Sequence, residues 1–195
     1  MNDTVLSVGG FLALFNGVVP RFEAEYRDWH ASEHVPERLS LPGFRSAVRF
    51  EAEPGTEPRY FTLYDLMGPE VLATDAYKAV VASPTPRSRA LRPYITDFAR
   101  FPCAAISAFG SMDCAFAATA ILPAVPKVAA GDGVAFRLGM LESELLDFPL
   151  GRMPEVASGA VVAIAAADAR AAIDCLLRDW AGDATRIGVF RRIER

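Results

Sequence analysis

The sequence has few of the residues that anchor disulfide or metal chemistry, with three cysteines and two histidines among 195 residues. Cys103, Cys114 and Cys175 are widely spaced and form no Cys-x-x-Cys pair, which argues against a disulfide framework or a zinc knuckle. We expect reduced core thiols in a cytoplasmic protein. A nucleophilic role for Cys103 stays open, although neither histidine is near it in the sequence.

Two further absences concern partners. Nowhere do about 18 uninterrupted apolar residues occur, so no membrane span is expected. The apolar run 5–19 is broken by Gly9, Gly10 and Asn16 and is preceded by Asp3, which favours a buried strand over a signal peptide. The net charge is -4 and the arginines are scattered singly, so we expect no nucleic-acid partner.

The composition is typical of a folded globule, because 52% of the residues are hydrophobic and 23% are charged. The length allows one domain or a fused pair. A short apolar run bounded by glycines predicts a strand over 9–18, and Pro20 suits the start of a helix. Val35 precedes Pro36, which predicts that this helix bends or ends there. Further strands are predicted over 44–53, 59–67 and 98–110, and a second helix over 69–83.

This order of elements is that of a ferredoxin-like unit, whose sheet has helices on one face only. The second half predicts strands over 114–122, 133–141, 159–168 and 185–194, and a helix over 167–182. Its first helix is expected to be absent or very short because Pro123, Pro126 and Gly131 interrupt the segment. We therefore predict an α+β fold of two ferredoxin-like (βαββαβ) units, 1–110 and 111–195, the second degenerate, with antiparallel sheets packed face to face as an α+β barrel.

Three motifs in the first half resemble a known family: Tyr26-x-x-Trp29, His34-x-Pro36-Glu37 and Leu41-Pro42-Gly43-Phe44. Over residues 9–110 the chain resembles EthD-like proteins of the dimeric α+β barrel superfamily. The resemblance implies cofactor-independent chemistry on small aromatic, polyketide-like or lactone substrates, although some members bind heme and many have no known activity. The long alanine-rich second half departs from this pattern and favours a barrel closed within one chain, with a homodimer as the open alternative.

Both histidines lie in Trp29–Arg38, WHASEHVPER. His30, Glu33 and His34 match H-x-x-E-H, the motif of one class of zinc peptidases. Such a site needs a third protein ligand, and Pro36 interrupts the helix directly after the motif. We therefore expect no metal and no other cofactor.

At about 100° per residue, Glu33 lies on the core-facing stripe of Phe22, Tyr26 and Trp29. A carboxylate there needs a partner, and an ion pair with Arg38 or Arg49 is the structural explanation. His30 lies on a flank and is expected to be solvated. His34 coincides with the family's histidine and can serve as a general acid/base, unless it only caps the helix end.

Strand alternation supplies partners for His34. We expect the faces with Tyr60, Thr62 and Tyr64 and with Arg45, Ala47 and Arg49 to point into the space between the two sheets. Arg45, nearer the turn, is expected to be more exposed than Arg49. Arg87, Arg89 and Arg92 follow two prolines and could bind an anion, although a solvated loop is the usual meaning.

The functional hypothesis is a small-molecule enzyme of the cyclase, isomerase or monooxygenase type. His34 is its acid/base, Tyr64 or Tyr60 donates a hydrogen bond to an oxyanion, and Glu33 orients His34. The expected substrate-binding residues are Trp29, Tyr60, Arg49 and Tyr26. The alternatives are a non-catalytic binder of a small hydrophobic ligand and an interaction protein.

Overall fold

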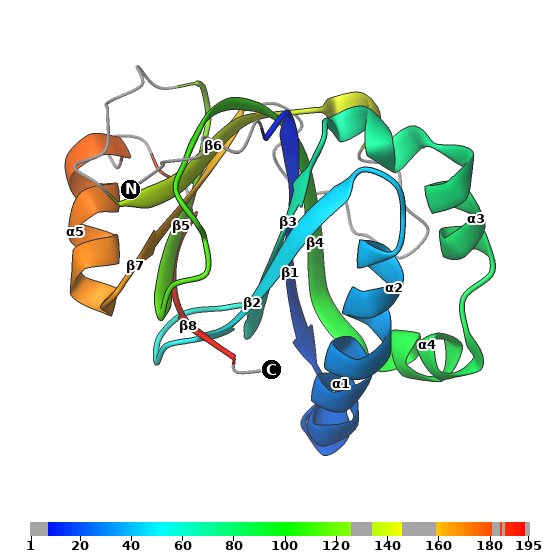
Figure 1. The fold of residues 1–195 in the computed structure, drawn as a ribbon. Helices are drawn as coiled ribbons and strands as arrows, with labels where there is room; N and C mark the ends of the chain where they lie inside the picture. The colour runs from blue at the N-terminus through cyan, green and yellow to red at the C-terminus, as the bar shows by residue number, and fades with distance from the viewer. Residues whose placement is uncertain (1–7, 126–133, 146–158, 181–183, 185, 194–195) are drawn as a thin grey trace.

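The computed structural model describes residues 8–125, 134–145, 159–180, 184 and 186–193. Its central feature is a closed barrel of eight antiparallel strands in the order β1-β3-β2-β8-β5-β7-β6-β4 (Figure 1). All eight strands come from one chain, as the long second half led us to expect. The strands are β1 Gly10–Val18, β2 Phe44–Ala52, β3 Tyr60–Leu66, β4 Ile95–Phe109, β5 Phe116–Leu122, β6 Ala135–Leu141, β7 Ala160–Ala166 and β8 Arg186–Arg192.

The barrel interior is filled by aromatic side chains. Phe15 stacks on Phe61 with ring centroids 4.9 Å apart, and its ring lies 5.7 Å from that of Phe101 and 6.1 Å from that of Phe190. Phe50, whose ring centroid is 5.7 Å from that of Phe61, extends this cluster. An eight-stranded barrel encloses just enough space for such side chains to fill.

The prediction of which strand face points inward was therefore wrong. Phe61 and Leu63 belong to the interior cluster, together with Val48 and Phe50. Tyr64 packs instead with the apolar residues beneath α3. Closing a barrel requires large apolar side chains inside it, so the tyrosine-bearing face turns outward against the helices.

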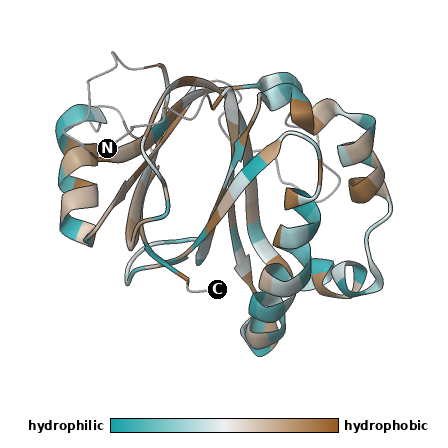
Figure 2. Ribbon diagram, in the orientation of Figure 1, coloured by the Kyte–Doolittle hydropathy of each residue, from teal (hydrophilic) through white to brown (hydrophobic). Residues whose placement is uncertain are grey.

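In the described ranges five α-helices lie on the outside of the barrel (Figures 1 and 2). Four of them lie on the strands of the first half, while α5 contacts β5, β7 and β8. The helices are α1 Glu23–Trp29, α2 Val35–Leu39, α3 Asp75–Ala82, α4 Pro86–Leu91 and α5 Ala169–Trp180. No helix in the described part of the chain is long and apolar enough to cross a membrane.

The helix expected over 69–83 is divided. A 3-10 turn, Pro69–Ala73, precedes α3, and the proline-rich segment after α3 forms the additional helix α4. Threonines cap both helices, since Thr74 Oγ1 accepts a hydrogen bond from the Tyr77 N–H (3.3 Å) and Thr85 Oγ1 from the Ser88 N–H (3.1 Å).

The first helix does not end before Pro36. A π-helical turn, His30–His34, joins α1 to α2, and the N–H of Val35 donates to the carbonyl of His30, five residues back. Val35 itself is helical (φ -66°, ψ -47°). Pro36 lies in the first turn of α2, where its missing N–H is tolerated. The prediction that the helix ends at Val35 was therefore wrong.

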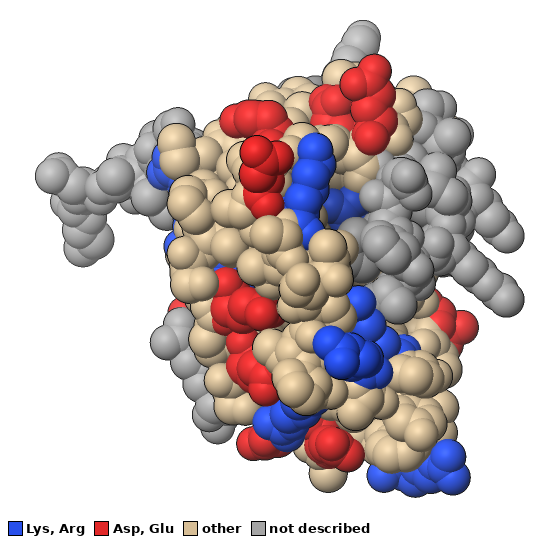
Figure 3. Space-filling view, turned by 90° about the vertical axis from the view of Figure 1, so that its right-hand side faces the viewer, with Lys and Arg blue, Asp and Glu red and all other residues tan. Residues whose placement is uncertain are grey.

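The two halves of the barrel have the same relative strand order. The first half reads β2-β3-β1-β4 across the sheet and the second reads β6-β7-β5-β8. Between β5 and β6 the described residues contain no helix, and residues 126–133 of that segment lie outside them. On the face shown in Figure 3, cationic and acidic side chains occur in small interspersed groups.

Candidate functional site

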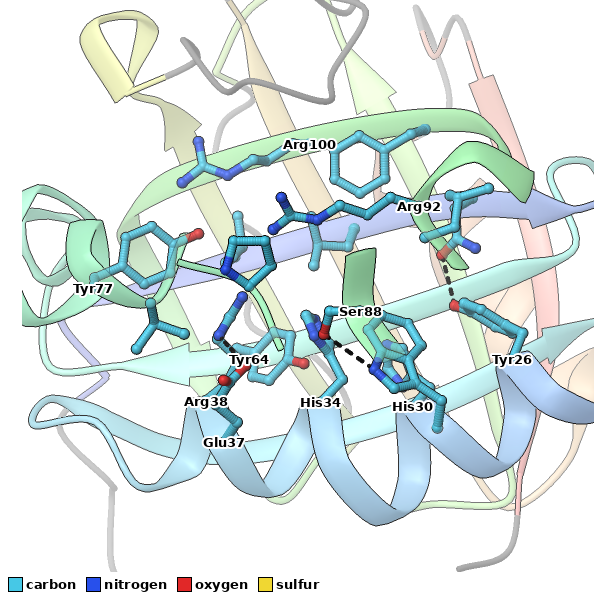
Figure 4. A pocket seen from close by; sticks show the side chains of 18 of the residues that line it. Tyr26, His30, His34, Glu37, Arg38, Tyr64, Tyr77, Ser88, Arg92 and Arg100 are labelled. Atoms are coloured by element: carbon cyan, nitrogen blue, oxygen red, sulfur yellow. Dashed lines mark hydrogen bonds and ion pairs between the residues drawn. The ribbon is translucent and has the colours of Figure 1, made fainter. Parts of the chain in front are cut away.

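A pocket of about 90 Å³ lies between the outer face of the first-half sheet and the helices that cover it (Figure 4). It is therefore on the opposite side of the sheet from the intersheet space in which we expected it. Its floor includes Leu12, Leu14 and Asn16 of β1 and Tyr64 of β3. The helices and the start of β4 supply the rest: Tyr26, Trp29, His30, His34, Glu37, Arg38, Tyr77, Val80, Pro84, Ser88, Arg92, Ile95, Phe98 and Arg100, with Phe44 from β2.

Both histidines line this pocket on consecutive turns of the helix. Their ring centroids are 5.1 Å apart, and the ring of His34 lies 4.7 Å from that of Trp29. Burial holds the pKa of His30 well below its usual value, and the neighbouring His34 lowers it further. Burial also lowers the pKa of His34, followed by the charge of Arg38. Both imidazoles are therefore neutral at pH 7.

Three uncharged side chains of the pocket each have a buried polar atom without a hydrogen-bond partner among the described residues. These atoms are Nδ1 of His30, Nδ1 of His34 and the hydroxyl of Tyr64. Burial raises the pKa of Tyr64 above its usual value, so its hydroxyl keeps its proton and can donate. Buried polar groups are normally satisfied, and a cluster without partners in one pocket is typical of a ligand site.

The aromatic wall of the pocket is fixed by hydrogen bonds. Trp29 Nε1 donates to Ser88 Oγ (3.2 Å), which ties α1 to α4. The Tyr26 hydroxyl donates to Asn16 Oδ1 (3.0 Å) on β1. Because these polar tips are satisfied, Trp29 and Tyr26 present rigid ring surfaces to the pocket.

Three arginines and one glutamate supply the formal charges of the lining. Arg38, which is 6% exposed, pairs with Glu37 through Nη1 and Oε2 (2.7 Å). The guanidinium groups of Arg38 and Arg100 lie 5.7 and 6.0 Å from the ring centroid of Tyr77. Figure 4 shows the side chain of Arg92 directed into the same region.

Four of the seven candidate residues from the sequence line the pocket: His34, Tyr64, Trp29 and Tyr26. The other three lie elsewhere. Tyr60 donates its hydroxyl to Glu23 Oε1 (2.9 Å), and Arg49 makes a long contact from Nη2 to the Arg27 carbonyl (3.5 Å). Glu33 accepts a hydrogen bond from Thr85 Oγ1.

The expected ion pair of Glu33 with Arg38 or Arg49 does not form, because Arg38 is occupied by Glu37. The expectation that His30 is solvated was also wrong, since it is 4% exposed. The π-helical turn changes the angular spacing that the helical wheel assumed, and it brings His30 to the sheet side. Arg45 is more exposed than Arg49, as predicted.

Sequence reasoning missed several residues of the lining, including Arg38, Tyr77, Ser88 and Arg100. Each comes from a different element, so no local pattern could have grouped them. Arg92 was noted as able to bind an anion, and it is the member of that arginine group that reaches the pocket. Arg87 instead pairs with Asp28 (2.6 Å).

No family model and no curated protein matches the chain. Its fold is similar to that of several solved structures. An anthrone oxidase-like protein superposes with a TM-score of 0.55 at 10% identity, covering 95% of this chain and 91% of the other. A heme-binding protein from Thermus thermophilus gives 0.58 at 10% identity, covering 95% and 92%. A chlorite dismutase mutant from Candidatus Nitrospira defluvii gives 0.53 at 6% identity, covering 97% and 93%. The chain therefore shares the fold of these proteins, here an α+β barrel of eight antiparallel strands.

One of these similar structures is a heme-binding protein, which raises the question whether a heme would fit the pocket of this chain. The two histidines of the chain both lie in the pocket and are the histidine candidates for an axial ligand. The space of about 90 Å³, however, is well below the roughly 300 Å³ at which pockets for drug-sized ligands begin. As its side chains lie, the space is too small for a heme.

The described residues also contain no group of three or more His, Cys, Asp and Glu side chains that could hold a metal ion. In the H-x-x-E-H segment, the carboxylate of Glu33 is engaged by Thr85 on α4. What this geometry offers is two neutral imidazoles, a protonated phenol and arginine side chains around a small space.

Proposed function

We propose that the chain is an EthD-like small-molecule enzyme that transfers protons in the pocket between the helices and the sheet, without a cofactor. The observation that carries this proposal is the convergence of three buried, unpartnered polar groups, those of His30, His34 and Tyr64, on one pocket. A carbonyl compound with an acidic C–H bond is a suitable ligand for these groups, because an imidazole can take the proton of that bond and the phenol can donate a hydrogen bond to the carbonyl oxygen.

His34 is the acid/base in this mechanism. Its imidazole is neutral at pH 7 and takes a proton from the carbon next to the substrate carbonyl, leaving an enolate. The hydroxyl of Tyr64 donates a hydrogen bond to the enolate oxygen. His34 then returns the proton to a different atom of the substrate. Isomerisation needs only such proton transfers. In a cyclisation the enolate carbon also attacks a second carbonyl carbon of the same substrate, whose C=O π bond opens, and His34 returns the proton to that oxygen. Neither reaction needs an oxidant, so among the implied reaction types these two fit best.

The remaining residues bind and position. Trp29 and Tyr26 form the fixed aromatic wall against which a planar substrate lies. His30 supplies a second neutral imidazole next to His34. Glu33 holds the helix to α4 through Thr85 and acts as a positioning residue. Tyr60 and Arg49 belong to the surrounding structure in this proposal.

We also propose that residues 1–110 and 111–195 are two ferredoxin-like units, the second degenerate. The shared relative strand order supports this division. The second unit has α5 between β7 and β8, in the place of α3 and α4 between β3 and β4. In this division the pocket belongs to the first unit, whose helices and strands supply all of its lining.

The test is the exchange of methyl protons for deuterium in pyruvate and in its neutral analogue pyruvamide, followed by proton NMR in buffered D₂O. Proton abstraction by the enzyme exchanges the methyl group whatever the natural product is. We expect exchange faster than in buffer alone. The H34Q and Y64F variants should each slow the catalysed rate by about 10²-fold or more, the usual contribution of a positioned acid/base or oxyanion donor.

The matched control is Tyr94→Phe, since Tyr94 stacks on Phe22 (3.6 Å between ring centroids) and does not line the pocket. It should exchange both probes at the wild-type rate. Exchange that is no faster than in buffer, or that is unchanged in H34Q, rejects the enzyme. Binding without exchange would leave a non-catalytic binder as the better description of the pocket.

A further inference from the structure

We infer that the pocket selects small carboxylates, with the anionic group of the ligand beside the guanidinium of Arg92 and the ligand carbonyl toward His34 and Tyr64. The position of the ligand carbonyl rests on the proposed function, whereas the preference for an anionic ligand does not. The inference names the class of substrate that the pocket takes.

The charges of the lining favour an anion. Three arginines face one glutamate, and both histidines are neutral. The acidic charge of Glu37 is held by Arg38 at 2.7 Å. An arginine does not lose its proton in a protein, so the excess positive charge of the lining stays unless a ligand balances it.

Arg92 is the arginine of the lining that is placed to bind such an anion. Its hydrogen bond among the described residues is a long one, 3.5 Å from Nη2 to the carbonyl of Val81 on α3, and it forms no ion pair there. Arg38 and Arg100, by contrast, have structural partners: Arg38 pairs with Glu37, and Arg100 donates through Nη1 to the carbonyl of Leu145. The planar guanidinium of Arg92 is suited to bind a carboxylate with two hydrogen bonds.

The electrostatics of Arg92 also favour an anion beside its guanidinium. Burial lowers its pKa, and the charge of Arg38 lowers it further. Two guanidinium groups thus repel each other in a partly buried space. A carboxylate between them removes this repulsion and replaces the water lost on burial.

The reacting groups lie on the facing side of the same space. Figure 4 shows Arg92 reaching in from the β4 side and His34 from the helix that faces it. Tyr64 is 1% exposed, and its unpartnered hydroxyl lies in the same lining. A ligand with a carboxylate at one end and a carbonyl at the other spans the two groups.

The size of the pocket limits the ligand. A space of about 90 Å³ is small for a ligand pocket, since pockets for drug-sized ligands begin at roughly 300 Å³. The space therefore takes a short keto acid or a single ring more readily than a fused-ring compound. Carboxylate recognition by Arg92 makes up for the small area of contact.

The test compares benzoate with benzamide, which has nearly the same shape but no charge, by ligand-observed NMR and calorimetry at low salt. We expect benzoate to bind wild-type protein at least 10-fold more tightly than benzamide. Arg92→Met should abolish this preference by weakening benzoate binding far more than benzamide binding, while Arg92→Lys should retain part of it. Circular dichroism checks that both variants are folded.

The matched control is Arg89→Met, an exposed arginine of α4 outside the lining. It should keep the full preference for benzoate, which separates a local contact from the general positive charge of the region. Equal binding of benzoate and benzamide, or a preference that survives Arg92→Met, overturns the inference. A preference lost equally in Arg89→Met also overturns it.

The two proposals fail separately. Equal deuterium exchange into pyruvate and pyruvamide, with no benzoate preference, leaves the enzyme and removes carboxylate selectivity. An Arg92-dependent preference for benzoate without exchange into either ketone leaves an anion-binding pocket and removes the enzyme.

Discussion

The rings of His30 and His34 lie 5.1 Å apart between centroids, inside the pocket and beside Trp29. The π-helical turn that contains them presents both to the sheet. A π-helical turn is rare and is frequently found at functional sites. The pair is the main reason for placing proton chemistry in this pocket.

This pair makes the protein less stable as the pH falls. Burial lowers the pKa of both histidines in the folded state, so below pH about 6.5 the unfolded chain binds protons that the folded chain does not. Folding free energy is therefore fully retained above pH 6.5 and lost as the pH falls toward the depressed pKa values. Urea unfolding at pH 7.5 and 5.5 measures the loss.

The control for this prediction is the variant with both histidines replaced by glutamine, which lacks the two titrating groups. It should lose less stability over the same interval than the wild-type chain, because only carboxylates then titrate. Equal losses in the two proteins would show that the histidines titrate normally in the folded state.

A bound carboxylate should raise the pKa of His34. In the free protein Arg38, Arg92 and Arg49 all lower it through their positive charge. An anion beside Arg92 offsets part of that charge, so imidazolium becomes easier to form. NMR titration of the imidazole signals with saturating benzoate should show this rise, with a smaller effect for benzamide.

Other ionisable groups also face His34, namely His30 on its own helix and Tyr64 on β3. Tyr64 does not ionise in this range because burial raises its pKa. The H30Q variant removes the other titrating neighbour and should keep the benzoate-induced rise. If the pKa of His34 did not change when benzoate was added, a binding position for benzoate next to Arg92 would be contradicted.

Ser88 holds the aromatic wall in place. Its Oγ accepts the hydrogen bond of Trp29 Nε1 (3.2 Å) and donates its own proton to Thr85 Oγ1 (2.9 Å), whose proton goes to the carboxylate of Glu33. Replacing Ser88 with alanine leaves the buried indole N–H without an acceptor, which costs about 1–3 kcal/mol of unfolding free energy. Ser40→Ala is the control, since the exposed Ser40 hydroxyl bonds only the Glu37 carbonyl (2.7 Å) among the described residues, and it should change stability by less than about 0.5 kcal/mol. Similar effects of both changes in urea unfolding would refute this role.

Strands with a clear two-residue period could be predicted from the sequence. The predicted segments 44–53 and 59–67 correspond to β2, Phe44–Ala52, and β3, Tyr60–Leu66. Their orientation could not be predicted, because both faces of β3 carry aromatic residues. Only the closure of the barrel determines that Phe61 points inward and Tyr64 outward.

The candidate site was predictable where its members share one helix. Tyr26, Trp29 and His34 lie on one segment, and all three line the pocket. The burial of His30 depends on a π-helical turn that the assumed spacing of 100° per residue does not contain. Arg92 and Arg100 join these residues only through the packing of distant segments, which local patterns do not specify.

The ion pair between Asp65 of β3 and Arg137 of β6 connects the two halves of the barrel. Arg137 Nε donates to Asp65 Oδ1 (2.7 Å) and Nη2 donates to Oδ2 (2.8 Å), while Nη1 donates to the carbonyls of Phe109, Gly110 and Phe136. In the barrel order β1 and β4 lie between these two strands, so the pair crosses the interior. Arg137 is 1% exposed and Asp65 5%.

Removing one partner leaves the other as an uncompensated buried charge, so Asp65→Asn should lower the unfolding free energy by about 3–5 kcal/mol. The matched control is Asp174→Asn, which breaks the exposed pair of Arg170 and Asp174 on α5 (3.3 Å) and should cost less than about 1 kcal/mol. Replacing both Asp65 and Arg137, with Asn and Met, should cost less than the sum of the single changes, since neither buried charge then remains. If Asp65→Asn were no more damaging than Asp174→Asn in urea unfolding, the two halves of the barrel would be held together by strand pairing and aromatic packing alone.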